Sequence, residues 1–256
     1  MDNLLLTVIT GILLPFFGTT LGSAAVFFMK KNRRAALTDC LSGFAAGVML
    51  AASVWSLLLP SIDHAKELGR LAFLPSAAGF FVGVAAMLAG ERMIEGLSKV
   101  QQYGKNSFIT ALAVTVHNLP EGMAVGLVFA VLMNYPDELS VSSALSLSLG
   151  IAIQNIPEGA IVSLPLYSRE RGKLRAFLYG VLSGAVEPVG AVMTLIFARL
   201  FSPLMPYFLS FAAGTMIFVV MNELSEEMST EKGKGRGMLF FALGFVIMMS
   251  LDVALG

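Results

Sequence analysis

The sequence predicts an all-α polytopic membrane protein, and three observations lead to this fold class. Hydrophobic residues make up 56% of the 256-residue chain, whereas charged residues make up only 13%. The apolar residues gather in long runs, and a helix needs about 20 of them to cross the hydrocarbon core of a bilayer. The charged residues fall mainly between these runs. Soluble domains contain about a quarter of charged residues, so that class is excluded.

Eight apolar runs are long enough to span a bilayer, and short connections join them. Their approximate bounds are 3–29, 36–60, 72–95, 108–133, 140–167, 173–200, 204–225 and 237–255. The first run follows the acidic residue Asp2, whereas a cleavable signal peptide begins with a basic segment. We therefore expect it to be retained as a span. The sequence predicts eight transmembrane helices in a single domain that covers residues 1–256.

The basic residues predict the orientation of the spans, because cytoplasmic loops are enriched in lysine and arginine. With eight spans, the first, third, fifth and seventh loops share one side of the membrane. These loops and their margins contain every basic residue except Lys66, Arg70 and Arg199, which is 14 of 17. The odd-numbered loops are therefore predicted to be cytoplasmic and both termini to be outside. The net charge of zero gives no sign of nucleic-acid binding.

A repeated segment predicts internal symmetry. Residues 44–49 have the sequence FAAGVM, and residues 211–216 have the sequence FAAGTM. The loop count makes these two helices run in opposite directions, and inverted repeats of this kind are typical of transporters. We expect a 3+2+3 arrangement, with inverted repeats at about 1–95 and 173–256 around a central helix pair at 108–167.

Pairs of glycines four residues apart predict close packing between helices, because this spacing is common at helix contacts in membranes. The pairs are Gly18/Gly22, Gly43/Gly47, Gly79/Gly83, Gly122/Gly126 and Gly180/Gly184. The spacing indicates close packing but does not by itself indicate a function.

The most informative polar feature is a hexapeptide that occurs twice inside apolar runs. Residues 117–122 have the sequence HNLPEG, and residues 154–159 have the sequence QNIPEG. Residues i, i+3 and i+4 share a helix face, so each glutamate lies beside its own imidazole or amide groups. If the two spans pack side by side, these polar faces meet. The candidate site residues are then His117, Asn118, Glu121, Gln154, Asn155 and Glu158, with Glu187 added by the next span.

Three glutamates at a similar depth in a membrane predict a bound cation, since they would otherwise repel one another or have to be protonated. Mixed nitrogen and oxygen ligands suit first-row ions such as Zn²⁺ better than Ca²⁺. Two other interpretations stay open at this point. The Pro-Glu-Gly segments are then either kinks whose carboxylates bond to a neighbouring helix, or a proton relay through Glu121 and Glu158.

Polar residues near the two membrane surfaces are compatible with more than one role. Asp63 and His64 in an outside loop are either solvated or help to capture ions. Asn222 and Glu223 near the inner end of the seventh span either end a helix or form an acidic exit.

An enzyme is the main rival class, in the form of an intramembrane metalloprotease. Such enzymes typically have a His-Glu-x-x-His motif, which places two histidines and a general base around a metal. The chain has only two histidines, His64 and His117, and no such motif, so we expect no enzyme. A metal-gated channel or a sensor stays open as an alternative. The single cysteine, Cys40, excludes a disulfide framework and a cysteine-rich metal site.

At the paired HNLPEG and QNIPEG motifs the chain resembles the ZIP (Zrt/Irt-like) family of divalent metal transporters, and most of all its bacterial GufA-like and ZupT-like branches. The resemblance implies a binuclear site on the fourth, fifth and sixth spans. It implies one metal held by His117, Glu121, Gln154 and Glu158. A second metal would be held by Asn118, Asn155 and Glu187, with Glu121 and Glu158 bridging the two ions.

The resemblance also implies a function and partners. The expected function is transport of Zn²⁺, together with Fe²⁺, Mn²⁺ or Cd²⁺, into the cytoplasm by alternating access. The metal is the transported substrate, and no organic cofactor is expected. A homodimer in the cell membrane is implied, with the bacterial inner membrane as its location. The chain departs from many family members in two ways, since it has no long His-rich loop before the fourth span and has Asn222 where they have a histidine.

Overall fold

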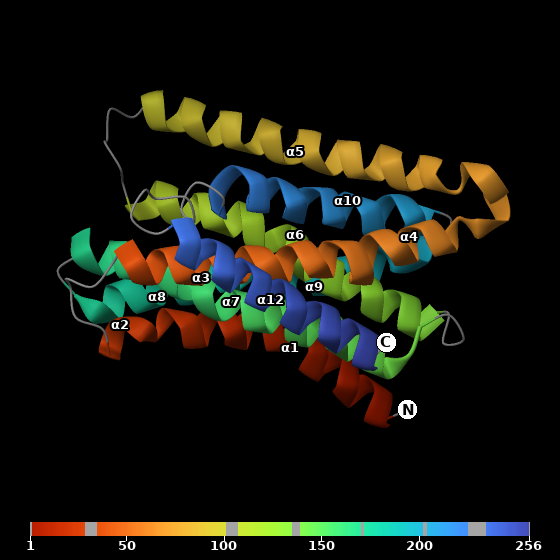
Figure 1. Cartoon of the computed structure of the whole chain (residues 1–256), viewed down its shortest axis with the longest axis horizontal. Coiled ribbons are helices and arrows are strands. Elements are labelled where there is room, and N and C mark those ends of the chain that lie inside the picture. The colour runs from red at the N-terminus through yellow and green to blue at the C-terminus, as the bar shows by residue number, and fades with distance from the viewer. Residues whose placement is uncertain are drawn as a thin grey trace.

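A computed structural model describes residues 2–28, 35–100, 107–134, 139–169, 172–201, 204–224 and 234–255. All regular elements in these residues are helices, and they run side by side along the longest axis of the molecule (Figure 1). The first helix begins and the last helix ends at the same end of the bundle (Figure 1).

The helices follow the predicted spans with small shifts at their ends. The first half contains α1 (Asp2–Ser23), α2 (Ala25–Phe28), α3 (Ala35–Ala52), the π-helical segment η1 (Ser53–Leu58), α4 (Leu59–His64), the 3-10 segment η2 (Lys66–Leu71) and α5 (Phe73–Val100). The central pair is α6 (Ser107–Asn134) and α7 (Val141–Arg169). The last part contains α8 (Lys173–Gly184), α9 (Val186–Phe201), α10 (Met205–Val219), the π-helical segment η4 (Val220–Leu224) and α12 (Lys234–Leu255).

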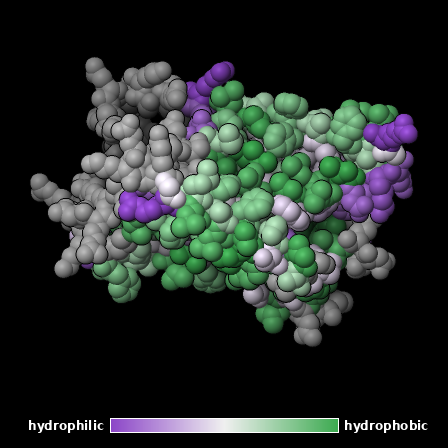
Figure 2. Space-filling model, viewed as in Figure 1, coloured by the Kyte–Doolittle hydropathy of each residue, from purple (hydrophilic) through white to green (hydrophobic). Residues whose placement is uncertain are grey.

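The helices have the length and polarity of membrane spans. Among the described residues, seven helical stretches are long and apolar enough to cross a bilayer. The remaining predicted span, at 108–133, coincides with α6, of which Asn118–Asn134 forms a shorter apolar stretch. Apolar residues cover the middle of the face shown in Figure 2, and most strongly hydrophilic residues lie toward its two ends. The prediction of an all-α polytopic membrane protein is confirmed, while the count of eight spans stays a prediction.

The sixth predicted span is interrupted, which the hydropathy pattern did not indicate. α8 ends at Gly184, and α9 begins at Val186. Pro188 has no N–H group to donate to the carbonyl of Gly184, so one bond of the helix ladder is missing at this point. The interruption places Glu187 in the first turn of α9.

The glycine spacings predicted close helix packing, and the structure confirms it. A Cβ atom added at Gly47 in α3 would lie 2.0 Å from the carbonyl oxygen of Phe241 in α12. One added at Gly83 in α5 would lie 2.3 Å from the carbonyl oxygen of Phe211 in α10, and one added at Gly214, which was outside the predicted pairs, would lie 2.3 Å from the carbonyl oxygen of Phe80 in α5. Real Cβ atoms do not come this close to backbone, so glycine is what permits these helix separations. α1 packs on α7, and α6 packs on α9, in the same pairwise manner.

The two spans with the repeated FAAG segment share a second feature. A π-helical segment begins nine residues after Phe44, at Ser53, and another begins nine residues after Phe211, at Val220. π-helical turns are rare in proteins. The chain colour in Figure 1 shows that α3 and α10 run in opposite directions. The two spans therefore resemble each other in sequence, in local helix geometry and in their glycine contact with a partner helix.

Candidate metal centre

The structure brings six of the seven predicted site residues together in the interior of the bundle. Asn118 and Glu121 are on α6, and Glu187 is on α9. The other three, Gln154, Asn155 and Glu158, are on α7. All six are buried, and none is more than 9% exposed. His117 is on α6, but its side chain lies outside the described residues.

Side-chain hydrogen bonds connect the three helices through these residues. Gln154 Nε2 donates to Glu121 Oε1 at 2.9 Å and joins α7 to α6. Asn118 Nδ2 donates to Glu187 Oε1 at 3.1 Å and joins α6 to α9. Glu121 also lies close enough to Glu158 and Glu187 for their charges to interact. The polar groups therefore form one cluster and not separate pairs.

The amide groups of the cluster also donate to the backbone of neighbouring helices. Asn118 Nδ2 donates to the carbonyl oxygen of Ser183 at 3.2 Å. Asn155 Nδ2 donates to the carbonyl oxygen of Pro15 in α1 at 3.4 Å. Since the NH₂ end of each amide is bound to the protein, its oxygen remains available as an acceptor.

Five buried oxygens of the cluster have no hydrogen-bond partner among the described residues. They are Asn118 Oδ1, Glu121 Oε2, Gln154 Oε1, Asn155 Oδ1 and Glu187 Oε2. A buried polar atom without a partner costs about 1–3 kcal/mol, so a group of five needs a physical explanation. A metal cation binds to oxygen lone pairs that no hydrogen-bond donor occupies, and carboxylate and amide oxygens are common metal ligands.

The amide oxygens are essential to this arrangement. Among the residues that the structure describes, no three imidazole, thiol or carboxylate groups are close enough to hold an ion by themselves. A coordination shell built from the described residues would combine the carboxylates with the amide oxygens of Asn118, Gln154 and Asn155. Zinc sites usually contain nitrogen or sulfur ligands, and His117 is the residue of this motif that has a ring nitrogen.

Sequence reasoning missed one member of the cluster, Thr19 in α1. Its Oγ1 donates to Glu187 Oε1 at 2.6 Å, and the residue is 1% exposed. A threonine inside an apolar run does not by itself predict a binding site, because threonine hydroxyls in helices usually bond to the backbone of their own helix. The contact between α1 and α9 that makes Thr19 part of the site is a tertiary feature.

Polar pairs occur toward both ends of the bundle. At the end where α12 finishes, Ser56 Oγ donates to Asp252 Oδ1 at 2.8 Å, and both residues line a hollow with Trp55. Toward the other end, Asn222 Nδ2 donates to Glu91 Oε1. In Figure 1 α12 ends on the right, whereas α5 and α10 end on the left. The sequence reasoning did not single out Asp252.

The remaining polar residues predicted near the surfaces are only partly described. Asp63 forms an exposed ion pair with Lys66, with 3.6 Å between Oδ2 and Nζ. His64 was expected in a loop but is the last residue of α4. Asp63 and His64 line a hollow beside Trp55, next to the hollow that contains Asp252. The side chain of Glu223 lies outside the described residues.

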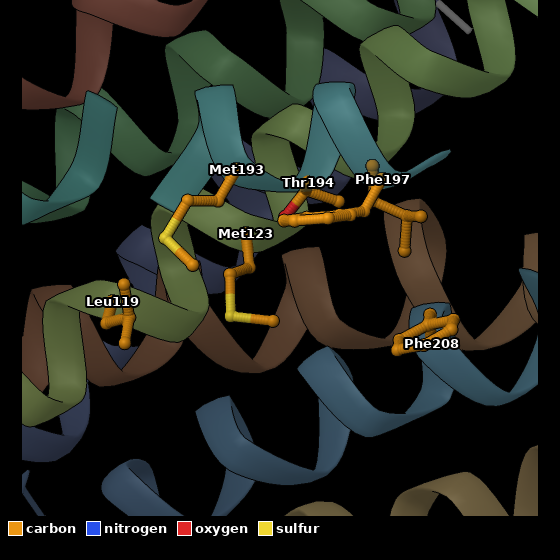
Figure 3. Close-up of a pocket in the computed structure, with 7 residues that line it drawn as sticks. Leu119, Met123, Met193, Thr194, Phe197 and Phe208 are labelled. Atoms are coloured by element: carbon orange, nitrogen blue, oxygen red, sulfur yellow. The ribbon is translucent and has the colours of Figure 1, made fainter. Parts of the chain in front are cut away.

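An apolar groove lies between α6, α9 and α10 (Figure 3), and none of the six polar residues of the cluster lines it. Leu119, Met123, Met193, Phe197 and Phe208 are among the residues that line it. The groove offers no carboxylate or amide oxygen, so it cannot hold a cation. The polar cluster is therefore the candidate functional site.

The fold and the buried oxygen cluster define a multi-pass helical membrane protein with a group of ligands suited to a cation. The profile of the family described as ZIP zinc transporters matches residues 91–252, which include all seven predicted site residues. The chain belongs to the ZIP family.

Curated relatives agree with this assignment. Zinc transporter ZIP11 of Xenopus tropicalis is 33% identical in an alignment that covers 96% of each chain. Zinc transporter ZIPB of Bordetella bronchiseptica is 36% identical over 94% of this chain and 79% of its own length. Zinc transporter GufA of Myxococcus xanthus is 32% identical over 79% of this chain and 81% of its own length. The predicted resemblance to the ZIP family and its GufA-like branch is therefore confirmed.

Proposed function

We propose that this protein transports Zn²⁺ across the membrane into the cytoplasm and binds it at the buried cluster on α6, α7 and α9. The observation that carries the proposal is the set of five buried oxygens without a partner among the described residues. Membership of the ZIP family supports metal transport as the general activity. The names of the relatives support zinc as the first substrate to test.

The site is proposed to be binuclear. His117, Glu121, Gln154 and Glu158 hold one ion. Asn118, Asn155 and Glu187 hold the second ion, and Glu121 and Glu158 bridge the two. The hydrogen bonds support this division, because Gln154 is tied to Glu121 and Asn118 is tied to Glu187. Two divalent ions would also offset the repulsion among three buried carboxylates.

Alternating access is the proposed mechanism, with inverted repeats at about 1–95 and 173–256 around the central pair 108–167. The paired packing of α3 with α12 and of α10 with α5 supports these repeats, as do the π-helical segments at equivalent positions. The cluster lies in the interior of the bundle, and the pairs Ser56–Asp252 and Asn222–Glu91 lie toward its two ends. An ion that crosses the bundle would meet these pairs before and after the central site.

The remaining sequence-based predictions are part of the same proposal. They are transport of Fe²⁺, Mn²⁺ or Cd²⁺ besides Zn²⁺, both termini outside, and assembly as a homodimer. The relatives come from a frog as well as from bacteria, so the bacterial inner membrane also stays a prediction.

The test is uptake of radiolabelled zinc into proteoliposomes that contain the purified protein. Glu121→Ala removes a carboxylate that both ions share, and we expect uptake to disappear. The matched control is Ser148→Ala in α7, since the Ser148 hydroxyl bonds to the carbonyl of Ala144 one turn away in its own helix. Normal zinc uptake by the Glu121→Ala protein would refute the assigned site.

The same experiment separates a carrier from the alternatives. Unlabelled zinc on the inside accelerates the entry of labelled zinc through a carrier, whereas it does not accelerate entry through a metal-gated channel. A sensor binds zinc but shows no uptake at any pH or gradient. Peptide cleavage dependent on zinc would be required of an intramembrane metalloprotease.

A further inference from the structure

We infer that Thr19 of α1 is the structural counterpart of Glu187 of α9, and that it is the residue that positions Glu187 in the metal centre and limits the site to three carboxylates. The inference rests on the proposed function and extends it to a helix that contributes none of the predicted ligands. Three matched contacts and one direct hydrogen bond support it.

The first matched contact involves the glycine that ends each copy of the hexapeptide. A Cβ atom added at Gly122 would lie 2.0 Å from the carbonyl oxygen of Glu187. A Cβ atom added at Gly159 would lie 2.3 Å from the carbonyl oxygen of Thr19. The two glycines are 37 residues apart and equivalent in the motif. Each copy of the motif is therefore pressed against a neighbouring helix at one residue, which is Glu187 in one case and Thr19 in the other.

In the second matched contact the glycine is on the neighbouring helix and the carbonyl group is in the motif. A Cβ atom added at Gly22 in α1 would lie 2.0 Å from the carbonyl oxygen of Ile156. One added at Gly190 in α9 would lie 2.8 Å from the carbonyl oxygen of Leu119. Ile156 and Leu119 occupy the same position in the two copies of the motif. Gly22 is three residues after Thr19, and Gly190 is three residues after Glu187, so the alignment of α1 with α9 keeps one register.

The third matched contact is made by the motif asparagines. Asn118 donates to the carbonyl oxygen of Ser183, and Asn155 donates to the carbonyl oxygen of Pro15. Ser183 is four residues before Glu187, and Pro15 is four residues before Thr19. Three contacts thus relate α1 to α9 by the same shift of 168 residues. A chance similarity between two helices would not reproduce the register in all three.

The side chains of the two equivalent residues meet inside the cluster. Thr19 Oγ1 lies 2.6 Å from Glu187 Oε1 and 3.4 Å from the carbonyl oxygen of Pro15, so the shorter contact takes the hydroxyl proton. Asn118 Nδ2 donates to the same carboxylate oxygen. With two donors on Oε1, the other oxygen of Glu187 is the one left for a metal. Thr19 therefore holds the carboxylate in an orientation that presents a single oxygen.

The difference between the two halves sets the charge of the site. The half built on α6 and α9 has Glu121 and Glu187, whereas the half built on α7 and α1 has Glu158 and Thr19. A neutral hydroxyl stands where the symmetric arrangement would place a fourth carboxylate. Three carboxylates leave two divalent ions with a net charge of +1, and four would leave none. A site with residual positive charge holds its ions less tightly, which favours release.

The first test compares two substitutions of Thr19 in zinc uptake and in zinc binding to the purified protein. Thr19→Val has nearly the same shape but no donor, and loss of a partner behind a metal ligand weakens metal binding by about 10- to 100-fold. We expect KM for zinc to rise by about this factor, whereas Thr19→Ser keeps the hydroxyl and should behave as the wild type. The control is Thr194→Val in α9, because the Thr194 hydroxyl bonds to Gly190 of its own helix.

The second test moves the carboxylate from one helix to the other. Glu187→Thr should abolish tight zinc binding, and Thr19→Glu in the same chain should restore a measurable part of it, because both positions face the same ions. Thr19→Glu alone should retain zinc longer and lower the rate of turnover. If Thr19→Val does not fold, Thr19→Ala, which only removes atoms, replaces it in the comparison with Thr19→Ser.

The wild type and Glu121→Ala are measured beside these variants, so that two kinds of failure can be told apart. If the wild type takes up zinc, Glu121→Ala does not, and Thr19→Val matches the wild type, the inference is wrong and the proposed function stands. A double exchange of Thr19 and Glu187 that binds no better than Glu187→Thr alone also contradicts it. If the wild type neither binds nor transports zinc, the proposed function falls and the inference with it.

Discussion

Gly122→Ala tests whether the separation of α6 from α9 determines the geometry of the proposed metal centre. A Cβ atom at this position would lie 2.0 Å from the carbonyl oxygen of Glu187, and ordinary contact begins at about 3.4 Å. Since the contacting atom is a backbone oxygen, no side-chain rotation can relieve the contact. The two helices must move apart by about 1.4 Å, which is the difference between these two distances.

Two effects of opposite sign act on the free energy of unfolding, and the larger one decides the direction of the change. Alanine is favoured over glycine in a helix by about 1 kcal/mol, which alone would stabilise the protein. Overpacking of a well-packed interior costs about 1–3 kcal/mol, and a rigid backbone contact lies toward the upper part of that range. We therefore expect a net destabilisation of up to about 2 kcal/mol.

The displacement also changes the ligands, since Asn118 is on α6 and Glu187 is on α9. Their hydrogen bond of 3.1 Å would be stretched beyond hydrogen-bonding range. Metal–ligand distances tolerate only about 0.2 Å, so a shift of this size should weaken zinc binding by about tenfold or more.

The assay is thermal unfolding of the purified protein in detergent, followed by zinc titration of the folded protein. Gly235→Ala is the matched control, because nothing lies within 4 Å of a Cβ atom added there. We expect the control to melt at or above the wild-type temperature and to bind zinc normally. If Gly122→Ala also melts at or above that temperature and keeps its zinc affinity, the close approach does not determine the site.

Three further predictions follow from other contacts. Gly214→Ala should lower the melting temperature, because its Cβ atom would lie 2.3 Å from the carbonyl oxygen of Phe80; an unchanged melting temperature would contradict the packing argument. Gln154→Glu replaces the donor to Glu121 by a carboxylate, so the metal-free protein should melt at a lower temperature than the wild type and gain more stability from added zinc. If added zinc raises the melting temperature of the two proteins equally, charge repulsion in the cluster is not the cause. Asp252→Asn removes a carboxylate that attracts zinc ions, so KM for zinc should rise with little change in kcat, and the rise should be smaller at high salt. A rise in KM that does not depend on salt would exclude this attraction.

Hydropathy and motif spacing predicted the parts of this protein that depend on local sequence. The runs of apolar residues located the spans, because the bilayer requires a minimum helix length whatever the neighbouring helices are. The spacing of Asn118 with Glu121 and of Gln154 with Glu158 predicted a polar face on each of two helices. The repeated glycines predicted close contacts, although they did not indicate which helices would be partners.

Other features could not be read from local patterns. The interruption between α8 and α9 lies in an apolar stretch that hydropathy treats as continuous, although Pro188 was a signal for it. Asp252 and Ser56 are 196 residues apart, and only the packing of α12 on α3 and η1 brings them together. Thr19 had no signal in a single-sequence pattern, because its role depends on which residue faces it.

The sequence by itself determined the class of the protein, the approximate positions of its helices and the residues that we propose to bind a cation. These follow from composition and from helical periodicity, which act over a few turns. Only the tertiary structure decided which oxygens have no donor among the described residues, which helix supplies Thr19 to Glu187, and how the two copies of the motif relate to α1 and α9. These properties depend on the separation and register of helices distant in sequence, and contacts of that kind are set by packing across the whole bundle.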